Sequence, residues 1–217
     1  MNNPITIAID AMGGDNSPNK VIEGIYIHSK ISKNIYYKIF GNKSLISPLI
    51  NKFSIDNNII EFFHTDNFIE GEDSALTAVK KGKNTSLWLA IESLKNNKAD
   101  AIVSAGNTGA LFVIAKLNLN MIENIDKPAL SGLWPNNNGM NIVLDLGANI
   151  ECNEKNLIDF TIMGCALHKS LFPDETSKIA LLNIGSEEYK GNNIIKNTYQ
   201  TLSSIKNDCF LISFLFI

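Results

Sequence analysis

Four short segments of the 217-residue sequence combine glycine with Asp, Asn, Ser or Thr, which is a composition suited to binding an anion. The most polar segment, residues 104–110, reads "SAGNTGA" and joins two apolar runs. It offers Ser104, Gly106, Asn107, Thr108 and Gly109 as candidate ligand groups. Glycine lets the backbone approach a ligand closely, and hydroxyl and amide groups add hydrogen-bond donors. The segment therefore predicts a site for an oxyanion such as phosphate.

The other three segments lie over residues 8–15, 142–149 and 181–188. They add Asp10, Gly13, Gly14, Asp15, Asp145, Gly147, Asn149, Asn183 and Gly185 to the predicted substrate-binding site. We expect the carboxylates of Asp10 and Asp145 to orient donors or a nearby lysine, not to act as bases. Each turn taken alone is also typical of an ordinary strand-to-helix connection, so the prediction rests on all four together.

Lys190 follows the fourth segment and is the candidate source of positive charge. The alternative is a solvated loop lysine. Arginine does not occur in the sequence, so no guanidinium fork can bind an anion. Backbone N–H groups, Lys, Asn, Ser and Thr remain as donors.

Several common activities lack their motifs here. The sequence has no G-x-x-x-x-G-K-[ST], no G-x-G-x-x-G after the first expected strand and no G-x-S-x-G. The sequence contains three cysteines, which is an odd number, and their spacing does not match that of metal ligands. We expect them to be reduced thiols. We expect no metal and no cofactor. A net charge of −3 argues against nucleic acid as a partner.

The elements that must position these groups alternate between apolar runs and helix-like segments, which predicts an α/β fold with a mostly parallel sheet. We expect strands over residues 5–10, 35–41, 58–64, 99–104, 128–134, 140–146 and 178–184, with a hairpin turn at 136–139. We expect helices over residues 18–31, 45–53, 73–81, 85–96, 107–119, 154–171 and 191–205, the first of them capped by Ser17. Carboxyl ends of parallel strands share one edge of the sheet, so all four segments are expected there.

Five motifs in order carry a resemblance to a known family. They are "DAMGGD" (10–15), "SAGNTGAL" (104–111), "KPAL" (127–130), "DLGAN" (145–149) and "LLNIGSEEYKG" (181–191). The sequence resembles the bacterial phosphate acyltransferases of phospholipid synthesis, from about residue 5 to about residue 206.

The resemblance implies a three-layer α/β/α fold similar to the isopropylmalate-dehydrogenase-like and phosphotransacetylase folds. It implies transfer of an acyl group from acyl carrier protein to inorganic phosphate, which feeds glycerol-3-phosphate acylation. It also implies a homodimer in the cytoplasm that can touch the membrane surface. We find neither a leader peptide nor an apolar run of membrane-spanning length in the sequence, and this agrees with the expected location. Lys190, which matches the lysine of the family's "E-x-x-K-G" stretch, and Asn107 are the residues we assign to catalysis.

The sequence departs from the family in three ways. Ala75 replaces a proline, and lysines replace the family's arginines. The family also continues beyond this chain with a segment that supplies a second catalytic Asn. We therefore expect one α/β domain over 1–206, the N-terminal two-thirds of the family fold, and a divergent apolar tail over 207–217 left by a frameshift or premature stop.

Two other functions stay open on the sequence alone. One is an inactive truncated remnant or partner-binding fragment. The other is a phosphotransacetylase-like acetyl transferase that uses coenzyme A.

Overall fold

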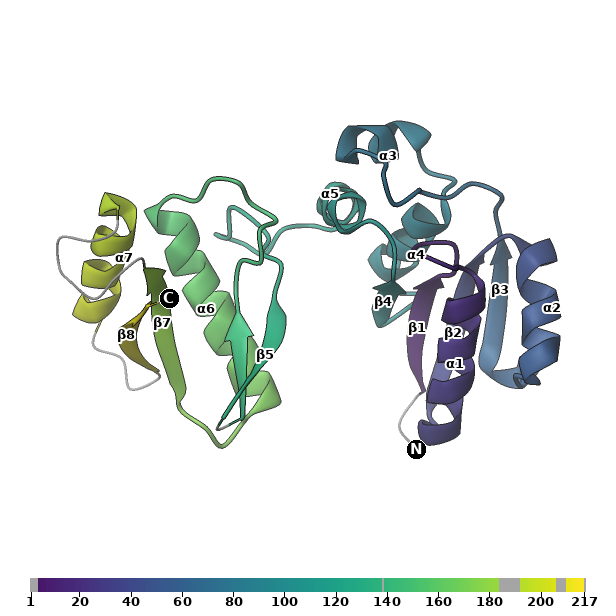
Figure 1. The fold of residues 1–217 in the computed structure, drawn as a ribbon, viewed down its shortest axis with the longest axis horizontal. Helices are drawn as coiled ribbons and strands as arrows, with labels where there is room; N and C mark the ends of the chain where they lie inside the picture. The colour runs from purple at the N-terminus through teal and green to yellow at the C-terminus, as the bar shows by residue number, and fades with distance from the viewer. Residues whose placement is uncertain (1–3, 138, 184–191, 206–209, 217) are drawn as a thin grey trace. The chain divides into compact units, whose positions relative to one another are not determined.

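A computed structural model describes residues 4–137, 139–183, 192–205 and 210–216. Contacts divide the chain into two compact units, Met1–Asn120 and Met121–Ile217, and each is described here by itself (Figure 1). That residues 1–206 form a single domain, followed by a divergent tail, stays a prediction.

A four-stranded parallel sheet forms the centre of the first unit. Its strands are β1 (Ile5–Asp10), β2 (Ile35–Gly41), β3 (Ile60–His64) and β4 (Ala101–Ser104), in the spatial order β3-β2-β1-β4. The chain first builds outward from β1 to β3 and then returns to place β4 on the other side of β1. This reversal makes the β1/β4 boundary the switch point of the sheet, where open α/β sheets bind ligands.

Helices cover both faces of this sheet. The helices of this unit are α1 (Asn19–Ile31), α2 (Lys43–Phe53), α3 (Ala75–Lys81), α4 (Ser86–Lys95) and α5 (Thr108–Asn118), with a short 3-10 turn, η1, at Asn57–Ile59. Among them α3 packs against α5. Ile22 of α1 and Ile46 of α2 pack with Ile9 on one face. Ala90 of α4 packs with Ala8 and Phe40 in a separate cluster. The alternation of Ala8 and Ile9 between these two cores confirms the three-layer α/β/α arrangement.

Side-chain caps explain where these helices begin. The side chains that accept a backbone N–H of the first turn belong to Asn42, Ser74, Thr85 and Asn107. Such residues stop the preceding segment and satisfy free helix donors. The predicted cap Ser17 is wrong: α1 has Pro18 at its N-cap position with no side-chain cap bond. The Ser17 hydroxyl instead donates to the Gly13 carbonyl, at 2.5 Å, and closes the turn after β1.

The second unit opens with a two-stranded hairpin. β5 (Gly132–Asn136) and β6 (Gly139–Val143) pair antiparallel, with Asn136 opposite Gly139. The predicted hairpin turn is confirmed. The expected strand over 140–146 ends at Val143, and its pairing with β5 is antiparallel, so the third glycine segment does not follow a strand of a parallel sheet among the described residues.

The rest of the second unit contains α6 (Glu154–Leu171), β7 (Ser177–Asn183), α7 (Asn193–Ser204) and β8 (Phe210–Phe216). β8 pairs in parallel with β7 along seven residues, from Ser177 opposite Phe210 to Asn183 opposite Phe216. The backbone of the apolar tail therefore has a strand partner, which the sequence does not predict. Among the described residues, no helix has the length and apolar character needed to cross a bilayer.

Candidate anion site at the switch point of the sheet

The two glycine turns of the first unit meet at the switch point. Asp10, the last residue of β1, lies opposite Ser104, the last residue of β4. The turns that follow both strands therefore leave the sheet side by side at its carboxyl edge. This confirms, for these two of the four segments, that they share one edge.

The contact between these turns requires glycine. A methyl group built on Gly13 would lie 2.5 Å from Asp10 Oδ2 and 3.0 Å from the Cα of Gly106. Gly14 has a φ of +94°, and a methyl group there would collide with the Ala105 carbonyl. Only residues without a Cβ allow the two backbones to approach this closely.

A buried carboxylate orders the contact. Asp10 is 3% exposed; its Oδ2 accepts a hydrogen bond from the Ser104 hydroxyl at 2.8 Å, and its Oδ1 accepts the Met12 N–H at 3.3 Å. The Ser104 hydroxyl oxygen in turn accepts the Gly106 N–H at 3.2 Å. Asp10 thus connects the two turns through Ser104, whereas its orienting role toward a ligand stays a prediction.

The side-chain amide of Asn107 has its oxygen and both its N–H groups engaged within the protein. Its Oδ1 accepts the Ala110 N–H at 2.9 Å and caps α5. Its Nδ2 donates to the carbonyls of Gly71 at 2.8 Å and Asp73 at 2.7 Å. An amide nitrogen has two N–H donors, so both have partners in this structure. The sequence did not single out Gly71 or Asp73, which lie more than 30 residues away and carry no motif.

The start of α5 offers donors at this edge. Thr108 and Gly109, the first two residues of α5, are exposed, and so is Asp15 in the neighbouring turn. The first N–H groups of a helix have no partner within the helix, and the helix dipole favours an anion beside them. The first turn of α5 is therefore the part of this edge that suits an oxyanion.

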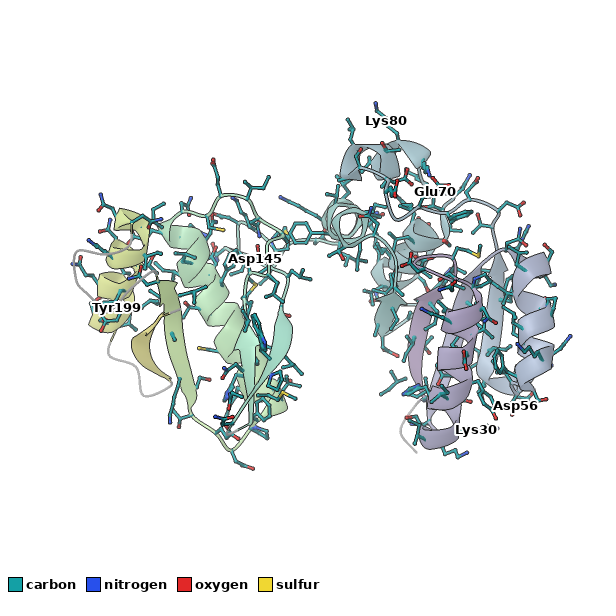
Figure 2. All side chains as sticks on the ribbon, viewed as in Figure 1. Lys30, Asp56, Glu70, Lys80, Asp145 and Tyr199 are labelled. Carbon is teal, nitrogen blue, oxygen red and sulfur yellow. The ribbon has the colours of Figure 1, made fainter. Side chains whose placement is uncertain are left out.

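The DLGAN segment of the second unit is organised around Asp145 (Figure 2). Its Oδ1 accepts the Leu130 N–H at 2.8 Å. Its Oδ2 accepts two hydrogen bonds from Asn149, from the backbone N–H at 2.7 Å and from Nδ2 at 2.9 Å. Gly147, between them, has a φ of +86°, which favours glycine. Asp145, Gly147 and Asn149 thus lie in one closed loop that is tied to the segment before β5.

Two opposing effects set the acidity of Asp145. Burial on its own raises the pKa of the carboxyl group, but the hydrogen bonds from Leu130, Asn149 and Ala148 together outweigh burial and hold the pKa below its ordinary value. The side chain is therefore a carboxylate at neutral pH and a weak base. An orienting role fits this environment.

The remaining predicted residues follow β7. Asn183, its last residue, is buried, at 6% exposure. Gly185 and Lys190 lie outside the described residues. Within the described part of the chain, no group of three or more His, Cys, Asp or Glu side chains is arranged to hold a metal ion.

An open hollow of about 640 Å³ lies in the first unit beside the start of α2. Lys43, Ser44, Ser47, Pro48, Asn51 and His64 line it. His64 accepts the Lys43 N–H through Nδ1, at 3.2 Å, and faces Asp66 across 3.6 Å through Nε2. None of these residues belongs to the four glycine segments.

Comparison of the sequence with known proteins gives one consistent result. Residues 5–212 match the family described as fatty acid synthesis protein. A phosphate acyltransferase of Pelagibacter ubique is 60% identical over 210 residues, which make up 97% of this chain and 62% of that protein. A phosphate acyltransferase of Paramagnetospirillum magneticum is 39% identical over 196 residues, 90% of this chain and 56% of that protein. The chain therefore spans less than two thirds of the length of these relatives.

Comparison of the fold gives phosphotransacylases as neighbours. The EutD phosphotransacetylase from Staphylococcus aureus has a TM-score of 0.68 at 15% identity, over 98% of this chain and 68% of that one. A branched-chain phosphotransacylase from Enterococcus faecalis has a TM-score of 0.60 at 14% identity, over 95% of this chain and 66% of that one. At these identities the likeness concerns the fold, and it confirms the predicted similarity to phosphotransacetylase.

Adding one methyl group tests the contact between the turns. We expect Gly13→Ala to lower the local stability at the ends of β1 and β4 by about 2 kcal/mol, because its Cβ has no room beside Asp10. The matched control is Gly109→Ala, whose Cβ would meet only Asn107 Oδ1, at an ordinary 3.4 Å, and which should stay within about 0.5 kcal/mol of the parent. Hydrogen exchange of the backbone amides in both strands measures the effect. Equal exchange in the two variants would contradict the close approach.

Removing the charge of Asp145 tests the loop that it orders. In Asp145→Asn one carboxylate oxygen becomes an NH₂ group, which cannot accept an N–H, and the other oxygen loses its charge, so we expect amide protection at Leu130 and Asn149 to fall by about 2 kcal/mol at pH 7. In the parent, the pKa of Asp145 is lowered by folding. Its contribution is therefore complete above the unfolded pKa of about 4 and is lost as pH falls through the lower folded pKa.

Protection factors measured from pH 7 downward separate these behaviours. The parent should lose protection in the acid range, whereas Asp145→Asn should show no such acid-dependent step. The exposed Asp174→Asn serves as the control and should follow the parent. A parent whose protection is independent of pH would rule out the charged hydrogen bonds.

Proposed function

Because the chain belongs to the family of fatty acid synthesis proteins, we propose that it acts as a phosphate acyltransferase. The proposed reaction moves an acyl group from acyl carrier protein to inorganic phosphate and yields acyl phosphate and the free carrier. The acyl phosphate then serves glycerol-3-phosphate acylation in phospholipid synthesis. The named relatives are phosphate acyltransferases, which supports this choice of reaction.

The observation that carries the proposal is the meeting of two glycine turns at the switch point, beside the first turn of α5. Phosphate binds at helix N-termini because free N–H groups and the helix dipole both favour negative charge there. The N–H groups of Thr108 and Gly109 are the proposed donors, with the Thr108 hydroxyl beside them. The backbone around Gly13 and Gly14 forms the facing wall.

The proposed chemistry needs no protein nucleophile. A phosphate oxygen attacks the thioester carbonyl carbon, a C–O bond forms, the C–S bond breaks, and the carrier leaves as a thiolate that takes up a proton. Orientation of phosphate against the thioester and stabilisation of the carbonyl oxyanion supply most of the acceleration. Lys190 is proposed to neutralise charge on phosphate or on the oxyanion.

The other predicted residues are proposed to position the reactants. The hydrogen bonds of Asn107 within the protein support a role in holding the start of α5. Asp10 and Ser104 fix the two turns. Asp145 and Asn149 order their own loop, and Asn183 and Gly185 belong to the segment that leads to Lys190.

The assembly and location proposed here follow the family resemblance. The protein is proposed to be a homodimer in the cytoplasm that binds acyl carrier protein and contacts the membrane surface. It is not expected to bind nucleic acid. Neither a metal nor a cofactor is part of the proposed reaction.

A direct assay separates this function from the alternatives. The purified chain is incubated with palmitoyl carrier protein and labelled inorganic phosphate, and acyl phosphate is trapped with hydroxylamine. We expect hydroxamate and carrier thiol in equal amounts, both dependent on phosphate. Acetyl-coenzyme A in place of the carrier substrate should give none. Activity with acetyl-coenzyme A alone would favour an acetyl transferase, and no activity with either would favour an inactive remnant or binding fragment.

Lys190→Ala tests the assigned source of charge. Loss of one preorganised charged donor should lower kcat about 100-fold or more. Lys178→Ala, which removes an exposed lysine from β7, is the control and should keep the parent rate. Normal turnover of the Lys190 variant would show that this assignment is wrong.

A further inference from the structure

Residues 70–73, shortly before α3, form a turn that two hydrogen bonds between Glu70 and Asp73 close. The Asp73 N–H donates to the Glu70 carbonyl at 3.2 Å, and the Glu70 N–H donates to the Asp73 carboxylate at 2.8 Å. The turn spans residues 70–73 and carries three carboxylates, of which those of Glu70 and Asp73 both lie near Lys81.

Lys81 holds the carboxylates of Glu70 and Asp73 together. It is the last residue of α3, and its Nζ lies 2.5 Å from Asp73 Oδ2 and 3.6 Å from Glu70 Oε2. The Asp73 side chain is only 10% exposed, and that of Lys81 is 32% exposed. Without the ammonium group, two like charges would remain at close range, which favours opening of the turn.

Asn107 of the candidate site also contacts this turn. The Asn107 amide donates to the carbonyls of Gly71 and Asp73, while its oxygen accepts the Ala110 N–H at the start of α5. Lys81 and Asn107 therefore both contact one turn. The spacing of Asp73 and Lys81, eight residues apart, gives no helical sequence signal for this arrangement.

We propose that Lys81 is a positioning residue for the anion site. By fixing the 70–73 turn, it holds the two carbonyls that orient the Asn107 amide, and Asn107 in turn holds the first turn of α5. Lys81 does not touch substrate. The inference rests on the proposed function for the identity of the ligand, but the physical coupling from Lys81 to α5 can be measured without it.

The acidities agree with this geometry. The hydrogen bond from Lys81, followed by that from the Glu70 N–H, lowers the pKa of Asp73. The hydrogen bond to Asp73 raises the pKa of Lys81 against the effect of burial. Both partners are therefore charged across the neutral range, so the turn is closed where the enzyme would work.

The first arm of the test follows hydrogen exchange at the Ala110 amide, which donates to Asn107. We expect about fivefold faster exchange in Lys81→Met and in Asp73→Asn, with parent rates in Lys81→Arg. The control is Lys80→Met, which removes the neighbouring lysine of α3. The Lys80 side chain is exposed and points away from the helix, whereas Glu70 lies beside α3 (Figure 2). Parent exchange rates in both Lys81→Met and Asp73→Asn would overturn the proposal.

A double variant shows whether the coupling passes through Asn107. Asn107→Ala removes the acceptor of the Ala110 N–H, so adding Lys81→Met should change Ala110 exchange no further. A further increase of the same size as in the parent background would mean that Lys81 acts by another route, and the proposal would be wrong. Circular dichroism of each variant confirms that differences arise in folded protein.

The second arm measures catalysis. Lys81→Met should lower kcat/KM for phosphate about fivefold with little change in KM for the acyl substrate, and Lys81→Arg should restore it. A merely destabilising change would not be confined to the phosphate parameters. If the parent itself forms no acyl phosphate, the proposed function fails, while the exchange measurements still decide whether Lys81 positions Asn107.

Discussion

The hydrogen bond from the Ser104 hydroxyl to the buried Asp10 carboxylate is the interaction on which the candidate site depends. It joins the last residues of β1 and β4, and the Gly106 N–H extends it into the second turn. A buried carboxylate is costly unless its oxygens are satisfied, so the surrounding backbone must adopt the conformation that supplies donors. Gly13 and Gly14 make that conformation possible, and α5 then starts at the edge of the sheet with its first two residues, Thr108 and Gly109, exposed.

The second unit uses the same physical device. Asp145 closes the loop that follows β6 by accepting hydrogen bonds from Leu130 and Asn149. In both units a carboxylate orders the backbone around it, and we propose that this ordered backbone offers hydrogen bonds to a ligand. Carboxylates that order the backbone, and backbone N–H groups that bind the ligand, would suit a reaction in which the attacking group is a bound anion. Preorganised donors stabilise charge at little reorganisation cost.

The sequence predicts the parts of this arrangement that are local. Alternating apolar runs predict the layers, and glycines beside Asp10 and Asn107 predict the turns and the start of α5. The sequence predicts the wrong role for Ser17, because a hydroxyl before proline can equally well close the preceding turn. The partners of Asn107 in the 70–73 turn, and β7 as partner of the tail, depend on which segments meet in three dimensions. Hydrogen bonds between residues distant in sequence leave no periodic pattern, so these features required the structure.

The central claim is that the first turn of α5 and the glycine turn after β1 bind phosphate. Backbone amide chemical shifts recorded while inorganic phosphate is added test it most directly. The account predicts saturable shifts at Thr108 and Gly109, accompanied by shifts at Gly13 and Gly14. Unchanged shifts at these four residues, with saturable changes instead around Lys43 and His64, would contradict it and would place the anion in the hollow beside α2.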